Sequence, residues 1–270
     1  MKKILLAVVL LFLLGGWVEK PNEKEEAELY YKNGNTKYNL NDFKGAILDF
    51  DKTIELNPKF TDAYIFRGFI KHTLKQYEKA ILDYNRAIEL NPKNADIYFN
   101  RGIAKNDLKQ YKEAILDFDK AIKLNPQYAN SYYNRGIAKD KLKQYKEAIL
   151  DYNKAIELNP KFTYAYNNRG NTKYKLKQYK EAILDYSKAI ELNPQYTIVY
   201  YNRGVAKHDL KNYIGAILDY NKAIKLNPQY AEAYFNRGNA RYELKNYRGA
   251  ASDFDKANKL NSDLKKPIKN

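Results

Sequence analysis

The chain has 270 residues, of which 44% are hydrophobic and 30% charged, and its formal net charge is +16. Such a composition can build a hydrophobic core, so it excludes a disordered chain. The absence of Cys excludes disulfides, thiolate metal ligands and thiol nucleophiles.

The first segment of the chain has the order of an export signal. Lys2 and Lys3 precede an unbroken apolar run, residues 4–14, which Gly15 and Gly16 follow. The run is short for a bilayer span, which needs about 20 apolar residues. We therefore predict a signal peptide or signal anchor over residues 1–18 and a polar linker over 19–26, with a buried hydrophobic helix as the remaining alternative. With a cleaved signal or an anchor, the rest of the chain is exported, and is periplasmic, envelope-associated or tethered to a membrane.

A period of 34 residues organises the rest of the chain. Asn-Pro occurs at 57–58, 91–92, 125–126, 159–160, 193–194 and 227–228, and a Gly column (34 to 238) and an Ala column (46 to 250) keep the same register. The pattern predicts seven repeats, at residues 27–60, 61–94, 95–128, 129–162, 163–196, 197–230 and 231–264. A short basic tail, residues 265–270, follows them.

Each repeat is predicted to be a helix hairpin. In the third repeat the apolar spacing i, i+3, i+4, i+7 predicts one face of a helix, carried by Tyr111, Ala114, Ile115, Phe118, Ala121 and Ile122. Pro126 ends this second helix, and a first helix is expected over roughly residues 96–108. The short turn between them makes the helices antiparallel neighbours. We expect Gly102 to allow close helix approach by facing a small residue such as Ala114.

These columns resemble the tetratricopeptide repeat family over residues 27–264. The resemblance lies in the Gly, Ala and Pro columns together with a first-helix aromatic (Tyr30 to Tyr234) and a turn aromatic (Phe43 to Tyr247). It implies an all-α solenoid, a right-handed superhelix of antiparallel helix hairpins with a concave groove for a ligand. It also implies a protein or peptide partner.

An Arg column departs from that family pattern, and an Asp column accompanies it. The residue before the Gly is Arg in six repeats, and an Asp recurs on the second helix: Arg67, Arg101, Arg135, Arg169, Arg203 and Arg237, with Asp49, Asp83, Asp117, Asp151, Asp185, Asp219 and Asp253. A half-buried Arg needs a fixed acceptor. We therefore predict a structural Arg–carboxylate ladder; the alternative is a row of ligand-binding arginines.

Aromatic residues outside the framework columns are the candidate binding surface. They are Tyr31, Tyr38, Phe99, Tyr133, Tyr174, Tyr201, Phe235 and Tyr242, all on first helices. The resemblance places these positions on the concave side, which predicts a groove for an extended peptide and an exported protein-interaction scaffold. As an alternative, these aromatics bridge adjacent first helices. A second functional hypothesis is a polyanion or membrane-surface binder that uses a Lys-rich convex face.

No residue pattern indicates catalysis or a bound cofactor. His72 and His208 are the two histidines, and neither has a second His or Cys at metal-ligand spacing. Phosphate-loop and nucleophile motifs are missing from the sequence. We predict a protein that is no enzyme and has no catalytic residues, metal or cofactor. Neither a small-molecule substrate nor a nucleic acid is an expected partner.

The last repeat departs from the others on its second helix. Ala251, Ser252 and Asn258 stand where the sixth repeat has Ile217, Leu218 and Ile224. A terminal repeat turns one face to solvent, so we expect the three polar or small residues to be exposed and their apolar counterparts to be more buried.

Overall fold

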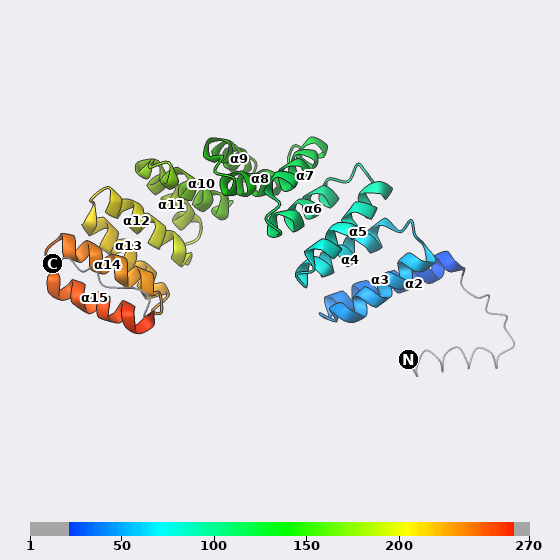
Figure 1. Ribbon diagram of the computed structural model, residues 1–270, viewed down its shortest axis with the longest axis horizontal. Helices are drawn as coiled ribbons and strands as arrows, with labels where there is room; N and C mark the ends of the chain where they lie inside the picture. The colour runs from blue at the N-terminus through cyan, green and yellow to red at the C-terminus, as the bar shows by residue number, and fades with distance from the viewer. Residues whose placement is uncertain (1–21, 262–270) are drawn as a thin grey trace. The chain divides into compact units, whose positions relative to one another are not determined.

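The computed structural model describes residues 22–261, and all its regular structure there is α-helical. The first two repeats and the last four are each a pair of antiparallel helices, as predicted (Figure 1). The chain divides into two compact units, residues 1–108 and 109–270. The predicted signal or anchor, residues 1–18, and the basic tail, residues 265–270, lie outside the described residues.

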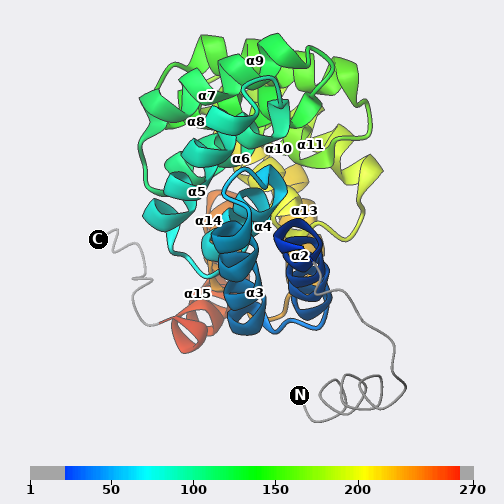
Figure 2. The same cartoon turned by 90° about the vertical axis from the view of Figure 1, so that its right-hand side faces the viewer.

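The first unit contains five helices within its described part, residues 22–108. The first helices of the repeats are α2 (Glu23–Asn39), α4 (Thr61–Thr73) and α6 (Ala95–Asp107), and the second helices are α3 (Phe43–Leu56) and α5 (Tyr77–Leu90). Each helix packs on the next along the chain, and α2, α3 and α4 lie nearest the viewer in Figure 2. The linker predicted for residues 19–26 differs from the structure, because residues 23–26 form the first turn of α2. Asn22 caps that turn by accepting from the Glu25 N–H (3.0 Å).

The second unit contains nine helices within residues 109–261. The first helices are α8 (Ala129–Lys141), α10 (Thr163–Lys175), α12 (Thr197–Asp209) and α14 (Ala231–Glu243). The second helices are α7 (Tyr111–Leu124), α9 (Tyr145–Leu158), α11 (Tyr179–Leu192), α13 (Tyr213–Leu226) and α15 (Tyr247–Leu260). Besides the sequential pairs, α8 contacts α10, α10 contacts α12 and α12 contacts α14. The first helices of this unit therefore form a continuous row.

The helix boundaries follow from local chemistry. A Pro follows directly after the Asn that caps each second helix from α3 to α13; Asn159, for example, donates its N–H to the Ala155 carbonyl (2.9 Å) before Pro160. At the turn inside each hairpin, a residue in the left-handed region ends the first helix. Lys143 has φ 62° there, and the following Gln144 N–H reaches back to the Lys139 carbonyl (2.9 Å). The same positive φ recurs at Asn41, Lys75, Lys109, Lys177, Lys211 and Lys245.

The glycine column makes room for an aromatic ring. A Cβ placed on Gly136 would lie 2.7 Å from Cε1 of Tyr152, which is almost fully buried on the second helix. The equivalent contacts join Gly34 to Phe50, Gly68 to Tyr84, Gly170 to Tyr186, Gly204 to Tyr220 and Gly238 to Phe254. At these positions an aromatic ring, not a small residue such as the Ala expected opposite Gly102, lies against the glycine. The alanines instead form the buried core of the hairpins.

Two of the three residues expected to be exposed in the last repeat, Ala251 and Ser252, are exposed, but of their two counterparts only Ile217 is half-buried. Asn258 and Ile224 are both half-buried, and Leu218 is 63% exposed although it belongs to an inner repeat. Leu218 lies two residues after the buried Ala216, about 200° around the helix, so it points away from the core.

Candidate functional site

The predicted Arg–Asp ladder is present within each unit as a row of bidentate ion pairs. Arg169 on α10 donates through Nε (2.9 Å) and Nη2 (2.5 Å) to the two carboxylate oxygens of Asp185 on α11. Lys173 donates to the same carboxylate (2.7 Å), and Arg169 Nη1 reaches Asn153 of the preceding repeat (2.7 Å). The same bidentate contact joins Arg67 to Asp83, Arg135 to Asp151, Arg203 to Asp219 and Arg237 to Asp253.

The other members of the ladder differ. The first repeat has Asn33 at the Arg position, and its Asp49 pairs with Lys37 (2.6 Å). Arg101 and Asp117 belong to different units, and within its own unit Arg101 donates to Asn85 (2.7 Å). In the paired repeats the carboxylates are buried and the guanidinium groups also lie over Tyr rings, as Arg169 does over Tyr166 (5.4 Å). This geometry favours the structural interpretation of these arginines over a ligand-binding one.

Five of the predicted groove aromatics contact the next repeat, and Tyr31, Tyr133 and Tyr201 do so from the same register. The Tyr133 ring lies 4.7 Å from the Phe162 ring, and its hydroxyl accepts from the Asn168 amide of the next first helix (3.0 Å). Tyr201 makes the equivalent contacts with Tyr230 (4.9 Å) and with Asn236 (2.9 Å). Burial is the main cause that raises the pKa of Tyr133 to about 12. Tyr31 similarly packs on Phe60 (4.8 Å) and on Phe66 of the next first helix (6.0 Å).

Four of the other predicted aromatics pack against a ring of their own hairpin, and Tyr38 also lies 6.0 Å from Phe69 of the next repeat. Phe99 is half-buried. The ring centroids lie 6.0 Å apart for Tyr38 and Phe43, 5.3 Å for Tyr174 and Tyr179, 5.5 Å for Phe235 and Phe254, and 5.2 Å for Tyr242 and Tyr247. Tyr174 also donates its hydroxyl to Asp209 of the next first helix (2.5 Å). Burial, together with that carboxylate, raises the pKa of Tyr174.

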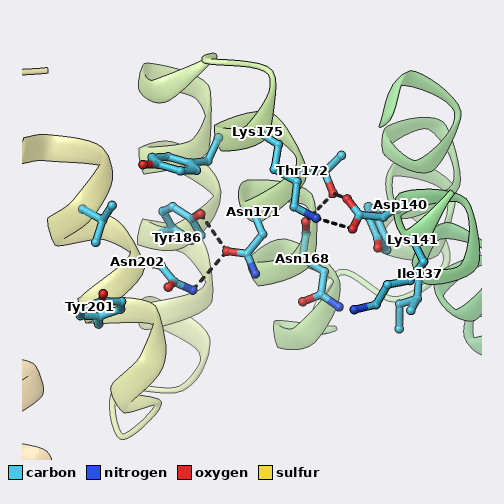
Figure 3. A pocket seen from close by; sticks show the side chains of 13 residues that line it. Ile137, Asp140, Lys141, Asn168, Asn171, Thr172, Lys175, Tyr186, Tyr201 and Asn202 are labelled. Atoms are coloured by element: carbon cyan, nitrogen blue, oxygen red, sulfur yellow. Dashed lines mark hydrogen bonds and ion pairs between the residues drawn. The ribbon is translucent and has the colours of Figure 1, made fainter. Parts of the chain in front are cut away.

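A cavity of about 520 Å³ opens along the row of first helices α8, α10 and α12 (Figure 3). Of the predicted groove residues, Tyr174 and Tyr201 line it and the other six do not. The remaining lining residues are Ile137, Asp140, Lys141, Tyr152, Asn168, Asn171, Thr172, Lys175, Tyr186, Asn202 and Val205. The site is therefore more polar than the predicted aromatic groove.

Asn171 lies at the centre of the hydrogen bonds in this cavity. Its side-chain oxygen accepts from the Tyr186 hydroxyl (2.8 Å) and from the Asn202 amide (3.1 Å). On the other side of α10, Thr172 donates to Asp140 of α8 (2.8 Å), which also pairs with Lys175 (Figure 3). These bonds tie three successive first helices together and hold the cavity side chains in place.

Two amide atoms in the cavity have no partner among residues 22–261. They are Nδ2 of Asn171, a donor, and Oδ1 of Asn202, an acceptor. Lys141 likewise makes no ion pair within the described part of the chain, and it is exposed. The cavity therefore offers one amide donor, one amide acceptor and one cation beside the rings of Tyr174 and Tyr201.

The sequence reasoning missed the asparagines of this site. Asn171 occupies the register of Ile137 on α8 and Val205 on α12, and Thr172 occupies the register of Ala138 and Ala206. A polar pair in columns that are apolar in the neighbouring repeats was the signal that could have identified the fifth repeat.

The histidines show no metal-like arrangement. His72 contacts Asp107 through Nε2 (2.8 Å), and His208 lies 3.6 Å from Asp209. Within residues 22–261, no three His, Cys, Asp or Glu side chains come close enough to hold a metal ion. Among these residues there is also no helix with the length and apolarity needed to cross a membrane.

Solved structures show the same fold. The chain is 28% identical to YrrB, described as a TPR protein with an unusual peptide-binding site (TM-score 0.58, covering 68% of this chain and 95% of that one). It is 27% identical to the MamA protein (TM-score 0.59, covering 63% and 93%). A tetratricopeptide repeat protein from Parabacteroides merdae shares the fold at 21% identity (TM-score 0.69, covering 88% and 97%). No curated protein matches the chain.

Family models cover most of the repeat region. Tetratricopeptide repeat models match residues 27–60, 95–128, 129–162, 163–196 and 231–264, and a TPR repeat model matches residues 70–107 and 206–245. These matches agree with the 34-residue register and with the helix hairpins. The chain therefore belongs to the tetratricopeptide repeat family.

Proposed function

We propose that this chain is an exported scaffold that binds an extended peptide segment of a partner protein in the cavity along α8, α10 and α12. The observation that carries the proposal is the pair of amide atoms on Asn171 and Asn202 that no described residue binds, in a cavity that Tyr174 and Tyr201 also line. A peptide backbone supplies one carbonyl acceptor and one N–H donor per residue. The two asparagines can therefore bind main chain, while the rings contact side chains.

The shape of the site also supports a peptide. An elongated ligand can cross several first helices in turn because these helices pack side by side. The lining residues differ from repeat to repeat, so each step along the row offers a different surface. YrrB, whose published description names a peptide-binding site, is similar in sequence and fold.

A display selection tests the proposal directly. Random peptides would be selected on the full-length chain, and the dissociation constants of the selected peptides would be measured by fluorescence anisotropy. Val205→Arg fills the cavity with a long charged side chain, and Asn239→Arg makes the same change in the same register on α14, outside the cavity. We expect V205R to weaken binding at least tenfold and N239R to leave it within about twofold. Equal binding by wild type and V205R would rule out this cavity.

Charge-reversing variants separate this proposal from the polyanion alternative. Lys112, Lys146 and Lys180 are exposed on second helices, away from the cavity. Replacing all three by Glu leaves peptide binding unchanged if the cavity is the site. If K112E/K146E/K180E abolishes binding, the basic face is responsible. Export itself is tested by fusing residues 1–26 to a reporter that is active only outside the cytoplasm.

A further inference from the structure

The outer side of α13 differs from that of every other second helix among the described residues. Two large apolar side chains on successive turns face solvent there: Ile214 is 67% exposed and Leu218 is 63% exposed. Residues four apart lie on the same side of a helix. The adjacent pair forms an apolar surface that no described residue of the chain covers.

Lysines stand at both ends of this apolar pair. Lys211 precedes α13 and is exposed in its left-handed turn, and Lys222 and Lys225 follow one and two turns after Leu218. Lys211 and Lys225 have no ion-pair partner among residues 22–261, and Lys222 lies over the Tyr200 ring (5.9 Å). The positive charge at both ends of the pair is therefore available to a ligand.

The same side of α13 lacks a free carboxylate. Asp219 is its single acidic residue, and it is buried and bound by Arg203 and Lys207. Other second helices carry exposed acids beside their exposed Leu, such as Glu147 and Glu157 on α9. A ligand of this surface must therefore be anionic and must also accept apolar side chains.

We propose that α13 docks this chain on an anionic phospholipid bilayer, with Ile214 and Leu218 inserted among the acyl chains and the flanking lysines on the headgroups. A bilayer interface has anionic groups directly above an apolar layer, and helices that lie in it combine an apolar face with cationic flanks. Long Lys stems reach the headgroups while the apolar face is buried. This surface belongs to second helices, so the peptide cavity on first helices α8, α10 and α12 stays accessible.

The absence of Cys from the sequence allows one position at a time to be labelled. Leu218→Cys would carry a polarity-sensitive dye in the full-length chain. Leu82→Cys is the matched control: Leu82 on α5 is 67% exposed, but Glu78 occupies the position that corresponds to Ile214. Each protein would be titrated with phosphatidylcholine vesicles, with or without phosphatidylglycerol, and with soluble polyphosphate.

We expect a blue shift at position 218 with phosphatidylglycerol vesicles alone, quenched by lipids that carry a quencher on the acyl chain. Adding Lys222→Glu and Lys225→Glu should lower the apparent partition constant at least tenfold, since each Lys near an anionic surface contributes about a further fivefold. No shift at 218, an equal shift at 82, or the same shift with polyphosphate would each overturn the proposal. The dye reports its own position, so vesicle binding through another part of the chain does not mimic the expected result.

Discussion

Removing one carboxylate of the Arg–Asp ladder should destabilise the fifth repeat. In Asp185→Ala, Arg169 loses both of its bonds to that carboxylate and Lys173 loses its ion pair. Breaking a buried ion pair by deleting one partner costs about 3–5 kcal/mol. The side chains of Arg169 and Lys173 keep some access to water, and Arg169 keeps its bond to Asn153. We therefore expect Asp185→Ala to destabilise the fifth repeat by about 3 kcal/mol, the low end of that range.

This loss should be measured locally, because repeat arrays do not unfold as a single two-state unit. Hydrogen exchange followed by mass spectrometry reports each helix separately. About 3 kcal/mol corresponds to roughly 100-fold faster exchange, expected in α10 and α11. Glu181→Ala is the control, since Glu181 is exposed on the same helix, and it should change stability by less than about 0.5 kcal/mol. Wild-type exchange rates in D185A would refute the ladder's structural role.

Three further predictions concern the turns, the glycine column and the tyrosines. Lys143→Gly should stabilise the fourth repeat by about 0.5–1 kcal/mol, because Lys143 has φ 62° and Gly adopts the left-handed region without strain. Unchanged or faster hydrogen exchange in α8 and α9 would contradict this. Gly136→Ala should destabilise by about 1 kcal/mol or more, since its Cβ would lie 2.7 Å from Tyr152 and overpacking outweighs the helix propensity of Ala; in the Tyr152→Leu background the loss should disappear. Burial raises the pKa of Tyr133 to about 12, whereas an unfolded Tyr has a pKa of about 10. The contribution of Tyr133 to the free energy of unfolding is therefore complete below pH 10 and is lost as the pH rises from about 10 to 12. Urea unfolding should show a smaller loss in that window for Tyr133→Phe than for wild type, and identical pH profiles would count against this interpretation.

The period of the sequence was sufficient to predict the hairpins, and its limits appear at individual side chains. Asn-Pro dipeptides and the alanine column define helix ends and one buried face. The spacing of residues does not determine the side-chain rotamer of an aromatic residue. Tyr133 was therefore predicted to face a ligand, although its ring packs on Phe162 and its hydroxyl accepts a hydrogen bond from Asn168. Gly102 was likewise expected to face a small residue such as Ala114, whereas the other glycines of its column face a Tyr or Phe ring. The period alone does not show which side chain of the facing helix lies against a glycine.

The site was harder to predict than the fold for a physical reason. Asn171 occupies a repeat position that is apolar in the neighbouring repeats, where it is Ile137 and Val205. A position of this kind is expected from the sequence to pack in the core rather than to bind a ligand. The importance of Asn171 comes from the Tyr186 and Asn202 bonds, which join three helices and are visible in three dimensions alone. The exposed Leu218 was missed for a related reason, since an apolar residue near a framework column is expected to be buried.

Photo-crosslinking tests the central claim, a peptide bound along α8, α10 and α12, most directly. A photoreactive phenylalanine analogue would replace either Tyr174, which lines the cavity, or Tyr247, which is 56% exposed outside it. A peptide selected on the wild-type chain should crosslink at position 174, with competition by unlabelled peptide, and not at position 247. Crosslinking at 247 with none at 174, while the peptide binds with unchanged affinity, would contradict the account.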